Sequence, residues 1–273
     1  MLTCLYFIVF NHIINADFNK RRKEMCEFCN HIEKADTTSQ MPLIGDKAPE
    51  FIANTTNGEV NFPADYAGKW VILFSHPADF TPVCTTEFMT FQSMLSEFQK
   101  FNTEVIGLSI GTLTSHLAWI KSIKEIDYRG WSGMNITFPI IDDMNMEVAK
   151  KYGMIHHNAA DGKTVRAVFI IDPQGIIRTI LYYPLTTGRN FDEIRRTLIA
   201  LQTADNFHVA TPADWQPGED VVVSAPSTTA GMNERISGQD KNLDVKAWYL
   251  TFKKLTKDEI IEKSTAKTNK KSK

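Results

Sequence analysis

The sequence is poor in cysteine: it contains four in 273 residues, and none of them follows Cys84. The long stretch after Cys84 therefore cannot be cross-linked by an internal disulfide, and the chain is not a disulfide scaffold. So few cysteines are typical of proteins from a reducing compartment, where a free thiol is more often catalytic than structural. We therefore expect a cytoplasmic protein in which Cys84 is a candidate for chemistry.

Strong charge of one sign and long apolar runs are also missing. The formal net charge is −2 and the pI is about 6.4, which favours neither nucleic acid nor an anionic membrane as the main partner. The apolar stretch over residues 1–15 is interrupted by Asn11 and His12 and is shorter than the roughly 20 residues of a membrane span. It also lacks the basic start and the cleavage site of a secretory signal. We expect no membrane segment.

Composition divides the chain into four parts. Residues 1–40 form an N-terminal extension that we expect to be disordered or not native, with Met41 as an alternative start. Residues 41–205 alternate strand-like and helix-like segments and form the predicted main domain. Residues 206–258 form a C-terminal extension, and residues 259–273 form a Lys-rich tail that is predicted to be disordered.

The main domain has the pattern of an α/β fold. Residues 70–74 are a short apolar run typical of a strand buried on both faces. Apolar residues at three- and four-residue steps then predict a helix over residues 85–101. The remaining predicted elements are a strand over 104–110, a helix over 114–126, a strand end at 138–143, a short helix over 145–152, a hairpin of 165–171 and 176–182, and a helix over 190–203. A thioredoxin-like fold is the natural member of this class.

The segment over residues 76–87 (HPADFTPVCTTE) leads from the buried strand into the helix and places Cys84 at the first helical turn. Free backbone N–H groups and the positive end of the helix dipole favour a thiolate at such a position. Thr81 lies one turn earlier, so its hydroxyl can point into the same small volume, and Pro77 and Pro82 stiffen the loop. Judged by position alone, Cys84 could equally be a buried small hydrophobic residue.

A motif decides between these alternatives. Pro77, Thr81 and Cys84 stand in the spacing P-x-x-x-T-x-x-C, which resembles the active-site signature of the peroxiredoxins, and residues 83–87 (VCTTE) are similar to the one-Cys branch. Further similarity lies in LIGDKAPEF, TGRN and VATPADW, and the resemblance runs from about residue 42 to about residue 255. The chain resembles an archaeal or bacterial one-Cys peroxiredoxin with a C-terminal extension.

The resemblance implies a thioredoxin-like fold and a thiol-dependent peroxidase that serves antioxidant defence. Cys84 would attack hydrogen peroxide or an organic hydroperoxide and become a sulfenic acid. Thr81 would hold the peroxide, Pro77 would shield the site, and Arg166 would stabilise the thiolate and the polarised O–O bond. An arginine in an apolar strand could instead form a structural ion pair.

Three further residues match the surroundings of this site in the family. Arg189 and Glu87 match family residues that surround the catalytic ones, where a carboxylate orients the guanidinium groups. His76 matches a histidine of the one-Cys branch that contacts the region of the sulfur, and a satisfied structural histidine is the alternative. We expect no metal and no other cofactor.

The sequence departs from its relatives where a second thiol would stand. Residues 243–252, where some archaeal relatives carry cysteines, contain none, so an external thiol such as a thioredoxin-like protein or glutathione is needed unless the N-terminus supplies one. Cys26 and Cys29 form a C-x-x-C pair that could be incidental, a resolving or redox pair, or part of a metal site with His31.

A second departure concerns a lipase-like motif that mammalian one-Cys relatives carry before the active-site strand. Lys69 stands where that motif has its serine, so the nucleophile is absent and phospholipase activity is not expected.

The C-terminal extension carries aromatic residues that favour burial, namely Trp215, Trp248, Tyr249 and Phe252. The resemblance implies that this extension packs against a second subunit, giving a homodimer and in some members a ring of dimers. The alternative is that it wraps around its own core.

Two other functions compete with the peroxidase. One is a chaperone of the same architecture, and a weaker one is a thiol–disulfide oxidoreductase that uses Cys26 and Cys29. The complete set of Pro77, Thr81, Cys84 and Arg166 favours the peroxidase, because a pure chaperone has no use for it.

Overall fold

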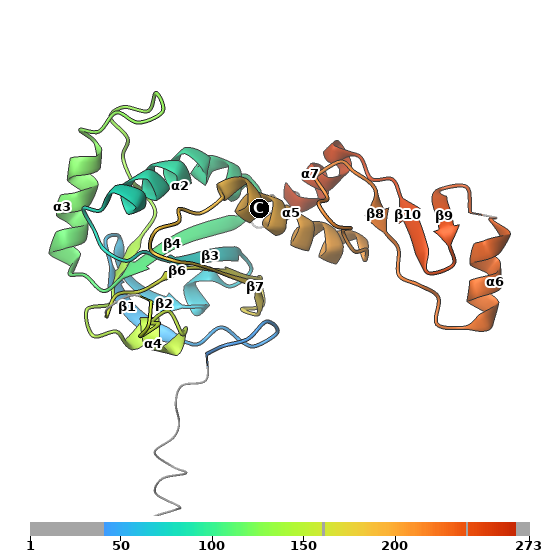
Figure 1. The fold of residues 1–273 in the computed structure, drawn as a ribbon, viewed down its shortest axis with the longest axis horizontal. Helices are drawn as coiled ribbons and strands as arrows, with labels where there is room; N and C mark the ends of the chain where they lie inside the picture. The colour runs from blue at the N-terminus through green and yellow to red at the C-terminus, as the bar shows by residue number, and fades with distance from the viewer. Residues whose placement is uncertain (1–40, 160–161, 239, 266–273) are drawn as a thin grey trace, which may run out of the picture. The chain divides into compact units, whose positions relative to one another are not determined.

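The computed structural model describes residues 41–159, 162–238 and 240–265 (Figure 1). Residues 1–40, and with them Cys4, Cys26 and Cys29, lie outside the described residues. The predictions for the N-terminal extension and for the C-x-x-C pair therefore stay predictions. Among the described residues, no helix combines the length and the apolar character needed to cross a membrane.

A mixed sheet of seven strands forms the centre of the described part, in the order β2-β1-β5-β4-β3-β6-β7. The strands are β1 (Phe51–Thr55), β2 (Gly58–Phe62), β3 (Trp70–Ser75), β4 (Thr103–Ser109), β5 (Ile140–Asp142), β6 (Arg166–Ile171) and β7 (Ile177–Tyr183). β3, β4 and β5 run parallel, whereas β6 is antiparallel to both β3 and β7. β3 and β6 are buried along their whole length, which explains their continuous apolar sequences. The predicted α/β architecture is confirmed.

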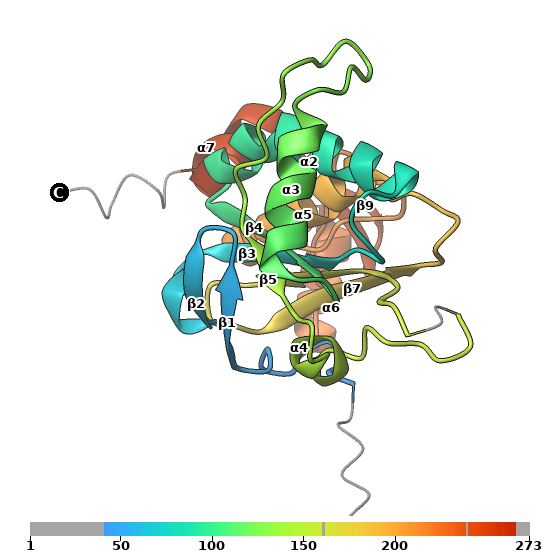
Figure 2. The same cartoon turned by 90° about the vertical axis from the view of Figure 1, so that its left-hand side faces the viewer.

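Helices cover both faces of this sheet. They are α2 (Pro82–Lys100), α3 (Leu113–Ile123), α4 (Glu147–Lys151) and α5 (Phe191–Phe207), with a 3-10 helix η1 at Ala64–Tyr66. α2, α3 and α5 contribute to the apolar cluster on one face, and α4 packs on the other (Figure 2). The side chains of Thr112 and Asn190 cap α3 and α5 by accepting backbone N–H groups of their first turns.

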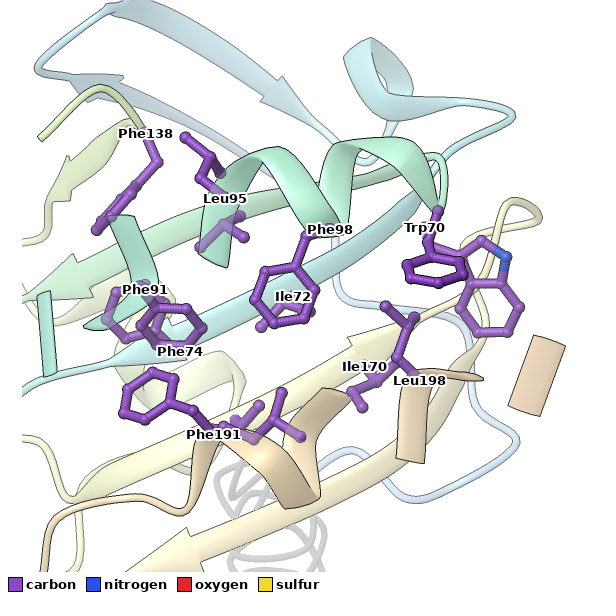
Figure 3. Close-up of a cluster of buried hydrophobic side chains, with 14 of the residues drawn as sticks. Trp70, Ile72, Phe74, Phe91, Leu95, Phe98, Phe138, Ile170, Phe191 and Leu198 are labelled. Atoms are coloured by element: carbon purple, nitrogen blue, oxygen red, sulfur yellow. The ribbon is translucent and has the colours of Figure 1, made fainter. Parts of the chain in front are cut away.

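Aromatic rings dominate the core between the sheet and these helices (Figure 3). Phe74 of β3 stacks on Phe91 of α2 with ring centroids 4.3 Å apart. Phe191, at the start of α5, meets Phe91 edge-on at 4.5 Å. The same rings therefore fix β3, α2 and α5 relative to one another, and the connection from β3 to α2 is held at both ends.

The structure contains elements that the periodicity did not indicate. β1 and β2 form a hairpin, and α2 begins at Pro82 rather than at residue 85, because a proline at the first helical position needs no N–H partner. The C-terminal extension contains a small antiparallel sheet, and a short helix connects its first strand to the next. These elements are β8 (Val221–Val222), α6 (Thr229–Ser237), β9 (Leu243–Ala247) and β10 (Leu250–Lys253).

The start of the Lys-rich tail differs from the boundary placed at residue 259. Helix α7 spans Lys257–Thr265, and Ile260 on it is fully buried in the same apolar cluster as Trp215 and Leu255. Burial of this isoleucine outweighs the polar composition around it. Residues 266–273 lie outside the described part.

The aromatic residues of the extension divide into two groups. Trp215 is fully buried within its own chain, and its Nε1 donates to the carbonyl of Glu219 at 3.0 Å. Trp248 and Tyr249, in contrast, are 38% and 61% exposed. The extension therefore packs partly on its own chain and leaves an aromatic surface uncovered.

Replacing Phe91 by alanine is expected to lower the free energy of unfolding by about 3–5 kcal/mol, because a fully buried ring would leave a cavity that the core can only partly close. Leu117→Ala on α3 is the control, since this side chain is 49% exposed and its loss should change stability by less than about 1 kcal/mol. Urea unfolding followed by circular dichroism measures both, and equal losses would contradict this packing.

Candidate active site

The loop over residues 76–81 connects β3 to α2 and places Cys84 in the first turn of the helix. Pro82 is the first helical residue and Thr81 is the N-cap. The Thr81 hydroxyl does not cap the helix, since it donates to the carbonyl of Ala78 at 2.9 Å. The N–H groups of the first turn therefore lack a side-chain acceptor, and their partial positive charge acts on the sulfur of Cys84.

Cys84 is fully buried and forms no disulfide within the described residues, and its sulfur accepts a hydrogen bond from Arg166. Nη1 of Arg166 lies 3.3 Å from Sγ and 2.8 Å from Oε2 of Glu87. Nε and Nη2 of the same arginine donate to the carbonyl of Leu185 at 3.2 and 2.9 Å. A guanidinium held on two sides in this way presents a fixed positive charge to the sulfur.

Glu87 joins this arginine to a second one. Its Oε2 accepts a hydrogen bond from Nη1 of Arg189 at 2.6 Å, and its Oε1 accepts the backbone N–H of Arg189 at 2.9 Å. Nη2 of Arg189 donates to the carbonyls of Ser75 and Ala167. Burial lowers the pKa of Arg189, and the carboxylate of Glu87 acts against that shift.

The charges of this buried group do not balance without the sulfur. Arg166 and Arg189 bring two positive charges, whereas Glu87 brings one negative charge. A thiolate at Cys84 supplies the missing negative charge within hydrogen-bond distance of Arg166. An anionic sulfur, which is the nucleophilic form of cysteine, would balance the charge of this group.

The other predicted site residues lie on the loop before α2. Pro77 is buried and Thr81 is half-buried. Nε2 of His76 lies 2.9 Å from Oδ1 of Asp79, and burial lowers the pKa of this histidine. Its Nδ1 has no hydrogen-bond partner within the described residues, so the side-chain hydrogen bond of His76 runs to Asp79 and not to Cys84.

Sequence reasoning missed the partners of His76 and the backbone acceptors of the two arginines. Asp79 contacts His116 as well, at 2.8 Å. The available signal was the position of His116, which precedes Ile120 and Ile123 on the apolar face of the predicted helix. Nothing in the sequence could indicate the carbonyl of Leu185 as an acceptor for Arg166, because every residue has a backbone carbonyl.

Glu87→Gln is expected to lower the free energy of unfolding by about 3–5 kcal/mol, because it leaves two buried guanidinium groups without their anion. Glu97→Gln on the same helix is the matched control, since Glu97 is 40% exposed and its pair with Arg195 is 3.5 Å long, so about 1 kcal/mol or less is expected. Denaturant unfolding measures both. A wild-type midpoint for Glu87→Gln would show that the buried pair contributes nothing.

Comparison with known proteins gives two family matches. Residues 44–180 match the model of the AhpC/TSA family, and residues 200–238 match the C-terminal domain of 1-Cys peroxiredoxin. The second match falls in the predicted C-terminal extension and in the end of α5.

Individual relatives cover most of the chain. A peroxiredoxin from Methanosarcina mazei is 57% identical, over 79% of this chain and 99% of its own length. A peroxiredoxin from Aquifex aeolicus is 49% identical, over 79% of this chain and 98% of its own length.

Solved structures agree with these relatives. The yeast mitochondrial 1-Cys peroxiredoxin aligns with a TM-score of 0.67 at 40% identity, covering 79% of this chain and all of its own. A cysteine-to-serine mutant of peroxiredoxin 6 from Arenicola marina aligns with a TM-score of 0.68 at 35% identity, covering 78% of this chain and 98% of its own. Together with the hydrogen bond between Arg166 and Cys84, these similarities assign the chain to the peroxiredoxin family, and it is a thiol-dependent peroxidase with a thioredoxin-like fold.

Proposed function

We propose that Cys84 is the residue that a peroxide oxidises. Its thiolate attacks one peroxide oxygen, the S–O bond forms as the O–O bond breaks, and the other oxygen leaves as water or an alcohol after taking up a proton. Cys84 becomes a sulfenic acid. The observation that carries this proposal is the 3.3 Å hydrogen bond from Arg166 to a buried sulfur beside an unbalanced positive charge.

The neighbouring residues take complementary roles. Arg166 stabilises both the thiolate and the charge that develops on the leaving oxygen, and Glu87 and Arg189 hold its guanidinium in place. The Thr81 hydroxyl donates to Ala78, which leaves its lone pairs to accept the hydrogen of a bound peroxide. Pro77 shields the site from water, and His76 lies at the start of the same loop.

An open groove beside the loop supports organic hydroperoxides as substrates in addition to hydrogen peroxide. Its volume is about 380 Å³, and Phe80, Thr81, Met89 and Trp119 contribute to its walls. The carbon portion of an organic hydroperoxide can lie against these apolar side chains while its O–O group faces Thr81.

The sulfenic acid is returned to the thiol by an external thiol, since no cysteine follows Cys84, unless Cys26 or Cys29 serves as the resolving thiol. The yeast relative is described with a thiol resolving mechanism that operates through glutathione and thioredoxin systems. We take the same two classes, a small thiol and a thioredoxin-like protein, as the candidate reductants here. This activity would contribute to antioxidant defence in the cytoplasm.

The proposed assembly is a homodimer, alone or within a ring of dimers. In it, residues 41–205 form the peroxidase domain and residues 206–258 form an extension that packs on a second copy. The exposed Trp248 and Tyr249 support this arrangement, since a second subunit would cover aromatic surface that the chain leaves open.

Peroxide consumption with dithiothreitol should be lost in Cys84→Ser and kept in a chain that starts at Met41. The serine cannot form the thiolate, whereas Cys26 and Cys29 are dispensable if the reductant is external. Full activity of Cys84→Ser would remove Cys84 from the reaction. A Met41 chain that stalls after one turnover with thioredoxin would identify Cys26 or Cys29 as a resolving thiol.

Arg166→Lys should lower the rate constant for oxidation of Cys84 by about 10²-fold, because a compact ammonium lacks the planar fork that reaches Leu185 on one side and Glu87 and the sulfur on the other. Arg178→Lys on β7 is the control, since Arg178 pairs with Asp205 at 26% side-chain exposure and should keep the wild-type rate. Stopped-flow oxidation by hydrogen peroxide measures both. Equal rates for the two variants would show that Arg166 is only structural.

A further inference from the structure

A second buried polar cluster lies beside the active-site loop, centred on Asp79. Nε2 of His76 lies 2.9 Å from one carboxylate oxygen, and Nδ1 of His116 lies 2.8 Å from the other. The hydroxyl of Ser115 donates to the second oxygen at 2.6 Å. Both histidine side chains are fully buried and that of Asp79 is 5% exposed. The cluster therefore joins the end of β3, the loop and α3.

The hydrogen bonds determine where the protons are. Burial raises the pKa of Asp79, but the hydrogen bonds from His116, His76 and Ser115 outweigh burial and hold that pKa far below its usual range. The ionised carboxylate can only accept hydrogen bonds. His76 therefore carries its proton on Nε2, and His116 carries its proton on Nδ1.

The opposite nitrogen of each ring lacks such a contact among the described residues. Nδ1 of His76 and Nε2 of His116 are buried and have no hydrogen-bond partner in the part of the chain that the structure describes. The groups that act electrostatically on His76 are Asp79 from the loop, His116 from α3 and Arg189 from the segment before α5. Neither Asp79 nor His116 takes part in the proposed oxidation of Cys84.

Helix α3 holds the loop at a second point. Nε1 of Trp119 donates to the Thr85 hydroxyl at 3.3 Å, and that hydroxyl donates to the carbonyl of Thr81 at 2.9 Å. The ring of Trp119 also lies 5.1 Å from that of His76. One side of α3 thus holds the chain on both sides of Thr81.

The loop needs such support. Phe80, between Asp79 and Thr81, adopts a left-handed φ of 55° and is 58% exposed. A non-glycine residue keeps this conformation only where its neighbours hold it, and this phenylalanine is too exposed for its own packing to do so. The contacts of Asp79 on one side and of Thr81 on the other therefore restrain the backbone of Phe80.

We propose that Asp79 and His116 are positioning residues of the peroxidase site, which anchor the Thr81 loop to α3 and fix His76 as the Nε2–H tautomer. Attack on a peroxide requires the sulfur, the O–O bond and the Thr81 hydroxyl to be aligned, and small displacements lower the rate strongly. The inference rests on the proposed roles of Cys84 and Thr81.

The test compares variants that keep or remove one donor. Asp79→Asn and His116→Leu should each lower the rate constant for oxidation of Cys84 by about tenfold or more. His116→Asn should retain most of the rate, because its amide nitrogen can replace the Nδ1 donor. Asp65→Asn, at an exposed carboxylate that accepts from Asn61, is the control and should match the wild type.

A second measurement separates positioning from loss of the nucleophile. The pH dependence of Cys84 alkylation by iodoacetamide should be the same in these variants as in the wild type, since the contact with Arg166 is untouched. If Cys84→Ser abolishes peroxidase activity and Asp79→Asn leaves it unchanged, the proposed function stands and the positioning role fails. An alkylation profile displaced together with the rate would also overturn the positioning role.

Nitrogen-15 NMR of the wild-type protein tests the tautomers even if a variant does not fold. A proton is expected on Nε2 of His76 and on Nδ1 of His116, the two nitrogens that face the carboxylate of Asp79. A proton on Nδ1 of His76 would overturn the proposal. So would stoichiometric Zn²⁺ binding lost in His116→Leu, because the three side chains also offer ligand atoms within 4.8 Å of one another.

Discussion

The interaction on which the candidate active site depends is the buried contact between two arginines, one glutamate and one cysteine. Arg166 and Arg189 share the carboxylate of Glu87, and the sulfur of Cys84 is the remaining acceptor of Arg166. Buried positive charge is unfavourable unless anions accompany it. Peroxidase chemistry needs an anionic sulfur, so the charge that this cluster lacks is the charge that the reaction requires.

The fold brings these groups together from separate parts of the chain. Cys84 and Glu87 lie one turn apart on α2, Arg166 begins β6, and Arg189 stands just before α5. Antiparallel pairing of β3 with β6 and the packing of Phe74, Phe91 and Phe191 set these elements in register. The apolar core is therefore what positions the polar site, and a polar site this deeply buried could not form without it.

Much of this could be predicted from the sequence, because strands and helices have periods and the Thr81–Cys84 spacing is a motif. Arg166 was found through family resemblance and not through its pattern, since an arginine in an apolar strand has several explanations. The carbonyl of Leu185 and the carboxylate of Asp79 act through tertiary contacts, which a single sequence does not display. Helix α7 was missed for a related reason: burial of Ile260 outweighs a polar composition.

The segment from His76 to Glu87 serves two polar clusters of different kinds. Its beginning, with His76 and Asp79, is bound to α3 through one carboxylate that accepts three hydrogen bonds. Its end, with Cys84 and Glu87, is bound to two cations. Because the carboxylate of Asp79 is met by three donors of its own, it takes no hydrogen bond from the arginines of the second cluster. Arg166 can therefore donate to the sulfur of Cys84. The loop that carries Thr81 lies between the contacts of Asp79 with α3 and the contacts of Cys84 and Glu87 with the arginines.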